Sequence, residues 1–129
     1  MAPLPRSGEL LDFSVIRDLA EATSDSGPGF LRGVLERFTS DASDCIERMR
    51  RHVRNGDTVS LASEAHRLKG SSGTVGAILL AGKCHEIERS ARAGVCTGIE
   101  PRLEQARDAL DATRVGLIAY FRGTIAAAA

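Results

Sequence analysis

Residues 31–53 read LRGVLERFTSDASDCIERMRRHV, and this stretch decides the fold. Its apolar residues recur at intervals of three and four, which is the spacing of one face of an α-helix. The apolar face consists of Leu31, Val34, Leu35, Phe38, Ala42, Cys45, Ile46, Met49 and Val53. Charged side chains occupy the opposite face, so the segment predicts a long amphipathic helix with one buried side.

Four further helices are predicted around this one. Asp12 is a good N-cap for a short first helix, and Asn55-Gly56-Asp57 supplies a stop for the long helix and a cap for the next. The four run from about residue 13 to the breaker at 24–29, from Thr58 to near Gly73, from Ala77 to Ala93, and from about 97–101 to Phe121. Short loops between long helices imply antiparallel neighbours. The predicted fold is all-α, an antiparallel four-helix bundle with a short additional N-terminal helix.

Length and composition limit the classes of function. The 129 residues suit one domain, which we expect to have a flexible lead-in at 1–11, a bundle at 12–123 and a frayed tail at 124–129. The chain has 17 basic residues (Lys and Arg) and 17 acidic residues (Asp and Glu), so there is no basic excess for binding nucleic acid. No apolar run is long enough to span a membrane, and the start lacks a secretory signal. Three cysteines without paired spacing favour the cytoplasm.

One histidine lies in a distinctive setting, the segment EAHRLKGSSGTVGA at residues 64–77. At about 100° per residue, Lys69 lies about 60° from His66 around the helix, and Gly70 and Gly73 lie about 40° and about 20° away. The nearby leucines, Leu61 and Leu68, point nearly opposite. We therefore expect His66, Lys69 and the two glycines to share an outward face.

This pattern suits phosphoryl chemistry. A neutral imidazole is a good nucleophile near pH 7, because its ordinary pKa is about 6.5. An ammonium one turn further on, that of Lys69, can stabilise the negative charge of a phosphoryl group in transfer. Gly70 and Gly73 carry no side chain, so another protein can approach closely.

The segment AHRLKGSSGTVGA, followed by CHEIERSARAG at 84–94, closely resembles histidine-containing phosphotransfer (HPt) domains of two-component phosphorelays. The resemblance covers about residues 12–122. It implies that His66 is phosphorylated on Nε2, that Lys69 contacts the phosphoryl group, and that Gly70 lets a receiver domain dock. Glu88 matches a position where the family has Gln or Glu directed at the other ring nitrogen.

Plainer interpretations stay open for several residues. The alternative for Glu88 is an ordinary ion pair at the surface. The alternative for Gly73 is a kink near the helix end. Ser71 is a candidate docking residue, and its alternative is packing as a small side chain. His52 is expected at a solvated helix end. His85 begins HEIER, which lacks the second histidine of a metalloprotease motif, so no metal site is expected.

The resemblance also implies partners. These are a response-regulator receiver domain, a hybrid sensor histidine kinase, or both, and the receiver brings its own Mg²⁺ while this chain binds no cofactor. The chain is then a phosphoryl carrier without autokinase activity, and we expect a monomer. The alternative is a helical adaptor that binds a signalling partner through the same face without phosphorylation. A nucleotide-binding enzyme is disfavoured, because no phosphate-binding loop of the correct spacing is present.

Overall fold

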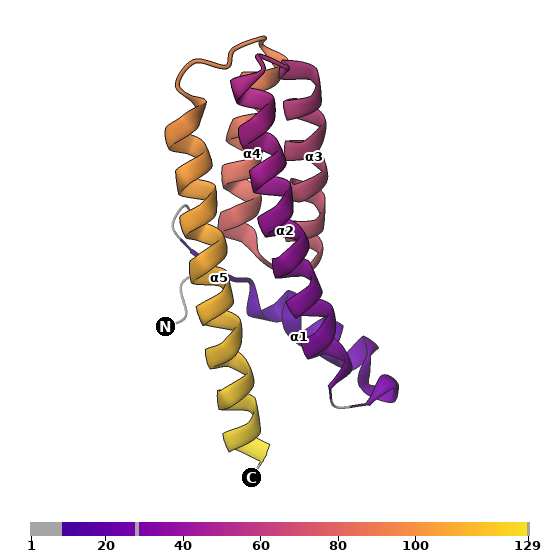
Figure 1. The fold of residues 1–129 in the computed structure, drawn as a ribbon. Coiled ribbons are helices and arrows are strands. Elements are labelled where there is room, and N and C mark those ends of the chain that lie inside the picture. Colours follow the sequence, from indigo (N-terminus) through magenta and orange to yellow (C-terminus); the bar gives the residue numbers. More distant parts are fainter. Residues whose placement is uncertain (1–8, 28, 129) are drawn as a thin grey trace.

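The structure, a computed structural model, describes residues 9–27 and 29–128, with side chains up to residue 123. Its elements are α1 (Phe13–Ala22), η1 (Ser24–Ser26), α2 (Phe30–Arg54), α3 (Thr58–Thr74), α4 (Ile78–Arg92) and α5 (Ile99–Ala128). The described residues contain no strand. Figure 1 shows α2 to α5 side by side in alternating directions, with α1 beside the lower part of α2. The predicted four-helix bundle with an extra N-terminal helix is confirmed.

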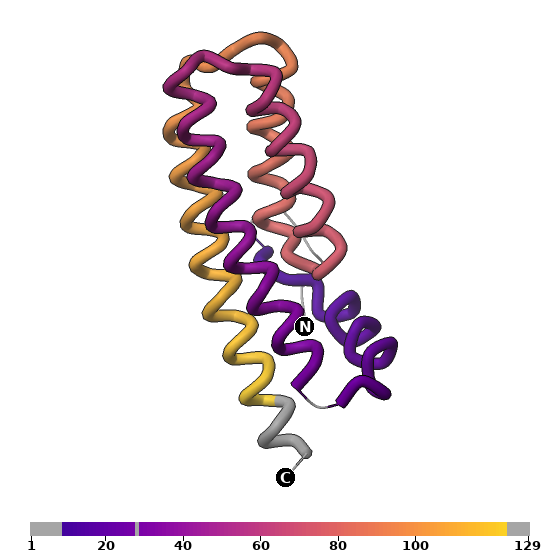
Figure 2. The backbone as a smooth tube through the Cα atoms, turned by 45° about the vertical axis from the view of Figure 1, so that its right-hand side comes forward, coloured from indigo at the N-terminus to yellow at the C-terminus, as the bar shows by residue number. Residues whose placement is uncertain are grey.

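The four long helices close into a ring in which α2 packs on α3, α3 on α4, α4 on α5, and α5 on α2. Their lengths differ, since α2 and α5 have 25 and 30 residues and α3 and α4 have 17 and 15. The two long helices therefore extend beyond the others at one end, where α1 lies (Figure 2).

Local sequence signals set several helix ends. Asp12 and Asp57 are the N-caps of α1 and α3, and their carboxylates accept hydrogen bonds from Ser14 N and Ser60 N, each at 3.0 Å. Pro101 lies in the first turn of α5, where its missing N–H costs no helical hydrogen bond. These caps agree with the boundaries expected from the sequence.

The last residues of the expected lead-in lie against the bundle, while the lead-in at 1–11 as a whole stays a prediction. Leu11 is buried, and Asp12 N donates to Gly76 O at 2.8 Å in the loop between α3 and α4. Gly76 has a φ of +80°, and a Cβ there would lie 2.8 Å from Asp12 O, so this close approach requires glycine. Residues 1–8 lie outside the described residues.

The frayed tail expected at 124–129 also stays a prediction. The helix α5 continues to Ala128, so residues 124–128 are helical, and residue 129 lies outside the described residues.

The core consists of the predicted apolar faces. Fully buried side chains come from every long helix and from α1, and include Ile16, Ile46, Met49, Leu61, Leu80, Cys84, Ile87, Leu103 and Leu110. Each large aliphatic side chain of this kind contributes about 1.5–3 kcal/mol when buried. Val34 is an exception, since it is 39% exposed although it belongs to the predicted buried face of α2. Val34 belongs to the first two turns of α2. This end of α2 extends past α3 and α4 (Figure 1), so fewer helices cover it.

Candidate functional site

His66 lies near the middle of α3 and faces solvent. Its side chain is 62% exposed, while Ala65 and Leu68 on either side of it are buried in the bundle. Gly70 and Gly73 are exposed on the same helix, and a Cβ added at either would meet no neighbouring atom within 4 Å. The outward face expected from helical periodicity is confirmed for His66 and both glycines.

Glu88 of α4 reaches the inner ring nitrogen of His66. Its Oε2 lies 3.0 Å from His66 Nδ1, and the Glu88 side chain is only 8% exposed. The pKa of Glu88 is lowered to about 2, mainly by the Lys69 ammonium. Burial raises this pKa, but hydrogen bonds from Arg92 and His66 also lower it. An ionised carboxylate only accepts hydrogen bonds, so in the neutral imidazole Nδ1 carries the proton and Nε2 keeps its lone pair.

Lys69 is held by the same carboxylate. Its Nζ lies 2.7 Å from Glu88 Oε1, on the oxygen that does not face the imidazole. The lysine side chain is 31% exposed, so it is half-buried and not fully exposed as the outward face predicted. The reason is its neighbour, since α4 packs against α3 and brings a buried carboxylate within reach. The ammonium has three N–H donors, so it can pair with Glu88 and still donate to another acceptor.

Arg92 completes this cluster, and sequence reasoning missed it. Its Nε and Nη2 lie 2.8 and 2.7 Å from Glu88 Oε2. The signal was available in the spacing of Glu88 and Arg92, because residues four apart are neighbours on a helix. The carboxylate thus binds two cations and one imidazole.

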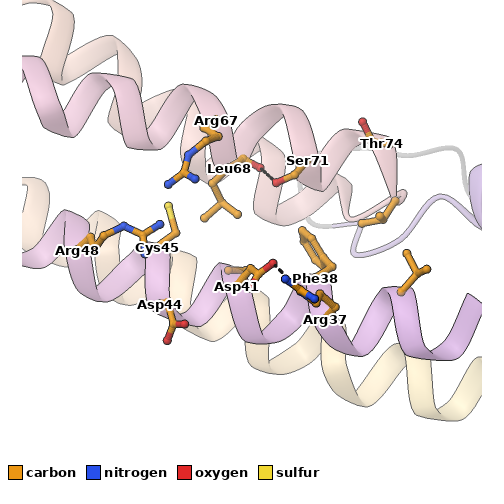
Figure 3. A pocket seen from close by; sticks show the side chains of 13 residues that line it. Arg37, Phe38, Asp41, Asp44, Cys45, Arg48, Arg67, Leu68, Ser71 and Thr74 are labelled. Atoms are coloured by element: carbon orange, nitrogen blue, oxygen red, sulfur yellow. Dashed lines mark hydrogen bonds and ion pairs between the residues drawn. The ribbon is translucent and has the colours of Figure 1, made fainter.

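Ser71, the remaining docking candidate, is exposed and donates a hydrogen bond from Oγ to Leu68 O at 3.3 Å. It borders a groove of about 630 Å³ between α2 and α3. Figure 3 shows Arg67 and Leu68 of α3 across this groove from Phe38 and Cys45 of α2. The groove does not include His66 among its lining residues.

A second charged cluster lies at this groove, around Glu64. Arg48 Nε donates to Glu64 Oε2 at 2.7 Å, Arg67 pairs with Oε1, and His52 Nε2 lies 3.7 Å from Oε2. His52 lies in the last turn of α2, as expected, but it is half-buried at this cluster and not solvated. Burial raises the pKa of Glu64, but the hydrogen bonds from Arg48 and Arg67 outweigh it and lower the pKa to about 2.

Cys45 and Cys84 are buried and Cys96 is half-buried, and all three thiols are free. Burial raises the pKa of Cys45 to about 11 and that of Cys84 to about 12, so both thiols stay protonated and pack as small apolar groups.

Within residues 9–27 and 29–128, no three His, Cys, Asp or Glu side chains gather as a metal site would need. No helix in that part of the chain has the length and apolar character to cross a membrane.

The fold and the site together define a helical bundle that presents one histidine, oriented by a buried carboxylate, to solvent. Residues 33–116 match the family described as Hpt domain, so the chain belongs to this family. The resemblance seen in the sequence is thereby confirmed.

Individual relatives agree with this assignment. The crystal structure of histidine-containing phosphotransfer protein B (HptB) from Pseudomonas aeruginosa PAO1 is 30% identical, with a TM-score of 0.80 over 92% of this chain and 98% of that one. Ypd1 of Saccharomyces cerevisiae, crystallised with the receiver domain of its downstream response regulator Ssk1, is 19% identical and shares the fold, with a TM-score of 0.82 over 91% and 97% of the two chains. The phosphorelay intermediate protein YPD1 of Candida albicans is 25% identical over 79 residues, which are 61% of this chain and 42% of that protein. The match thus spans less than half of that relative's length.

Proposed function

We propose that this protein is a phosphorelay carrier, in which His66 accepts a phosphoryl group from a receiver-domain aspartate and passes it to another. The observation that carries the proposal is the 3.0 Å contact of His66 Nδ1 with buried Glu88, combined with an imidazole that is 62% exposed. This contact fixes the proton on Nδ1 and leaves the nucleophilic Nε2 at the surface. The names of the relatives support it, since one is a phosphorelay intermediate and another is crystallised with a receiver domain.

The transfer step follows from this geometry. The Nε2 lone pair attacks phosphorus, the Nε2–P bond forms, and the P–O bond to the partner's aspartate breaks. The electron pair of the broken bond returns to that aspartate carboxylate. Nδ1 keeps its proton, so the imidazole ring becomes cationic, and the negative charge of Glu88 stabilises it. The reverse sequence passes the group to the next receiver.

The surroundings of His66 suit a visiting protein. Gly70 and Gly73 leave the helix surface open beside the imidazole, so the partner's aspartate can come within bonding distance. Lys69 is one turn from His66, and the N–H donors of its ammonium that do not face Glu88 can stabilise the phosphoryl oxygens. Ser71 lies exposed on the same helix and is proposed as part of the docking surface.

Mg²⁺ is assigned to the receiver partner. The charged cluster that includes His66 contains Lys69, Glu88 and Arg92, which are two cations and a single carboxylate that both of them already pair with. Mg²⁺ prefers carboxylate and other oxygen ligands with several waters, so this cluster does not fit the ion. The phosphoryl group therefore meets Mg²⁺ only in the acidic pocket of the receiver.

The experiment uses receiver domains of the source organism, each phosphorylated with radiolabelled acetyl phosphate and mixed with this protein. We expect acid-labile label on the wild-type chain and none on His66→Gln. Normal transfer to His66→Gln, or no transfer from any receiver, contradicts the proposal. Equal binding of receivers whose aspartate is replaced by asparagine, without any label transfer, would instead support the adaptor function.

Two further experiments test the finer roles. Lys69→Ala is expected to slow transfer by at least about tenfold with an unchanged far-UV spectrum, because the lysine packs into no core position. We also propose that the chain has no autokinase activity, so incubation with labelled ATP and Mg²⁺ should leave His66 unlabelled. Label on His66 under those conditions would contradict this part of the proposal. Monomeric state and cytoplasmic location stay predictions.

A further inference from the structure

We propose that Arg67 is a specificity-determining residue for docking, and that it binds an acidic side chain on the surface of the receiver partner. This inference rests on the proposed function of His66 and adds the chemistry by which a partner is selected. It is carried by an exposed guanidinium that borders the groove between α2 and α3 and keeps N–H donors available.

Arg67 follows His66 on α3 but faces a different direction. Consecutive side chains are about 100° apart around a helix, so Arg67 is turned towards α2. Figure 3 shows its side chain extending from α3 into the groove. Arg67 lines this groove together with Ser71, one turn further on, whereas His66 does not line it. A receiver that covers Ser71 therefore also reaches Arg67, which contacts the partner protein and not the phosphoryl group on His66.

Glu64 holds Arg67 through one nitrogen only. Nη2 of Arg67 donates to Glu64 Oε1, and no hydrogen bond is found for its Nε or Nη1 in the described part of the chain. A guanidinium has five N–H donors in a fixed planar arrangement, so several of them stay available to a partner. Since the Arg67 side chain is 65% exposed, Glu64 orients the cation while its other donors lie at the surface.

Arg48 already balances the charge of Glu64. Its Nε donates to Glu64 Oε2 at 2.7 Å and its Nη2 to Oε1 at 3.4 Å. His52 Nε2, 3.7 Å from Oε2, adds a positive charge only when it is protonated. Two guanidinium groups on one carboxylate leave at least one surplus positive charge, and Arg67 is the more exposed of the two arginines. The group that this surplus charge attracts is a carboxylate, which can accept two parallel N–H bonds from a guanidinium.

The acidic residues across the groove do not take up the remaining donors of Arg67. Asp41 of α2 pairs with Arg37 at 3.7 Å. Asp44 is exposed on α2, and no hydrogen bond or ion pair joins it to Arg67 among the described residues. The carboxylate that completes the contact therefore comes from the partner.

The experiment uses a receiver domain that labels the wild-type chain and measures the transfer rate as a function of receiver concentration. At about 0.05 M salt, Arg67→Ala is expected to raise the half-saturating receiver concentration about fivefold, which is about 1 kcal/mol at about 1.4 kcal/mol per tenfold. The maximal rate should not change, because Arg67 does not contact the phosphoryl group. At about 0.5 M salt the rise should shrink to less than about twofold, since salt screens exposed charges. Arg67→Lys keeps the charge and should recover most of the affinity.

Arg54 provides the matched control. It is exposed at the end of α2, outside the groove, and no side-chain hydrogen bond or ion pair is found for it within the described residues. Arg54→Ala removes the same charge and should leave the half-saturating concentration unchanged. An equal rise in both variants would show a general effect of net charge and would overturn the inference.

Charge reversal tests the chemistry of the partner. Arg67→Glu should raise the half-saturating concentration more than Arg67→Ala does, because two carboxylates then face each other. The exposed Asp and Glu residues of the receiver outside its phosphorylation pocket are replaced singly by Lys. One of these replacements should restore transfer to Arg67→Glu and weaken transfer to the wild-type chain.

The outcomes separate this inference from the proposed function. Failure of every receiver replacement to restore transfer to Arg67→Glu, or a lowered maximal rate in Arg67→Ala, would overturn the inference. If the wild-type chain accepts no phosphoryl group, the proposed function fails. If it transfers normally and Arg67→Ala matches Arg54→Ala, only this inference fails.

Discussion

Replacing Glu64 with glutamine should lower the free energy of unfolding by the amount that one buried charge contributes. The Glu64 side chain is 14% exposed and pairs with Arg48 and Arg67. Glutamine keeps the shape of the side chain and an acceptor oxygen but loses the negative charge. The variant therefore tests the electrostatic contribution and leaves packing nearly unchanged.

The magnitude follows from the pKa of Glu64, which falls from 4.5 to about 2 in the folded protein. At about 1.4 kcal/mol for each unit of pKa, the ceiling is about 3 kcal/mol. Arg67 is 65% exposed, so solvent screening reduces the expected loss at pH 6 to about 1–2 kcal/mol. With a urea dependence of about 1.5 kcal/mol per molar, the unfolding midpoint should fall by about 1 M.

The pH dependence gives the sharper test. Because the folded pKa lies below the unfolded value, the contribution of Glu64 is present above about pH 4.5 and is lost as pH falls towards 2. Urea unfolding followed by circular dichroism should show the gap between wild type and Glu64→Gln shrinking to less than half between pH 6 and pH 3. Glu36→Gln is the control, since Glu36 is exposed and no ion pair is found for it in the described part of the chain. A gap that stays constant with pH, or an equal loss in the control, would refute the reasoning.

Four further substitutions test the bundle and its docking face. Gly76→Ala should destabilise the protein by about 2 kcal/mol or more in urea unfolding, because Gly76 has a φ of +80° and a Cβ there would collide with backbone. Gly73→Ala lies inside α3 with open space around it and should stabilise the protein by up to about 1 kcal/mol. Equal effects of the two substitutions would contradict this reasoning. Leu80→Ala, at a fully buried position, should cost about 2–5 kcal/mol, and a loss below about 1 kcal/mol would show that the core tolerates a cavity there. Gly70→Phe should keep the melting temperature and reduce phosphotransfer more than tenfold; normal transfer would place the docking surface elsewhere.

The sequence by itself was sufficient for much of the helical framework. The apolar spacing, the caps at Asp12 and Asp57, and the glycine-containing breaks predicted helices close to those observed. These signals are local, since a helix repeats every 3.6 residues and its ends depend on a few neighbouring residues. The same periodicity placed His66 on an outward face, which the structure confirms.

Only the tertiary structure decided which charged side chains contact one another at the site. Lys69 was expected in solvent, but it pairs with Glu88, and Arg92 joins the same carboxylate. The exposure of Val34 also depends on which helix ends project past their neighbours, and Leu11 is buried because the segment before α1 lies against α5. A single helix fixes which residues share its face, but the distance between side chains on two helices depends on the rotation and vertical offset with which the helices pack. For this reason the sequence determined which histidine faces solvent, whereas packing of α4 against α3 decided which charges surround it.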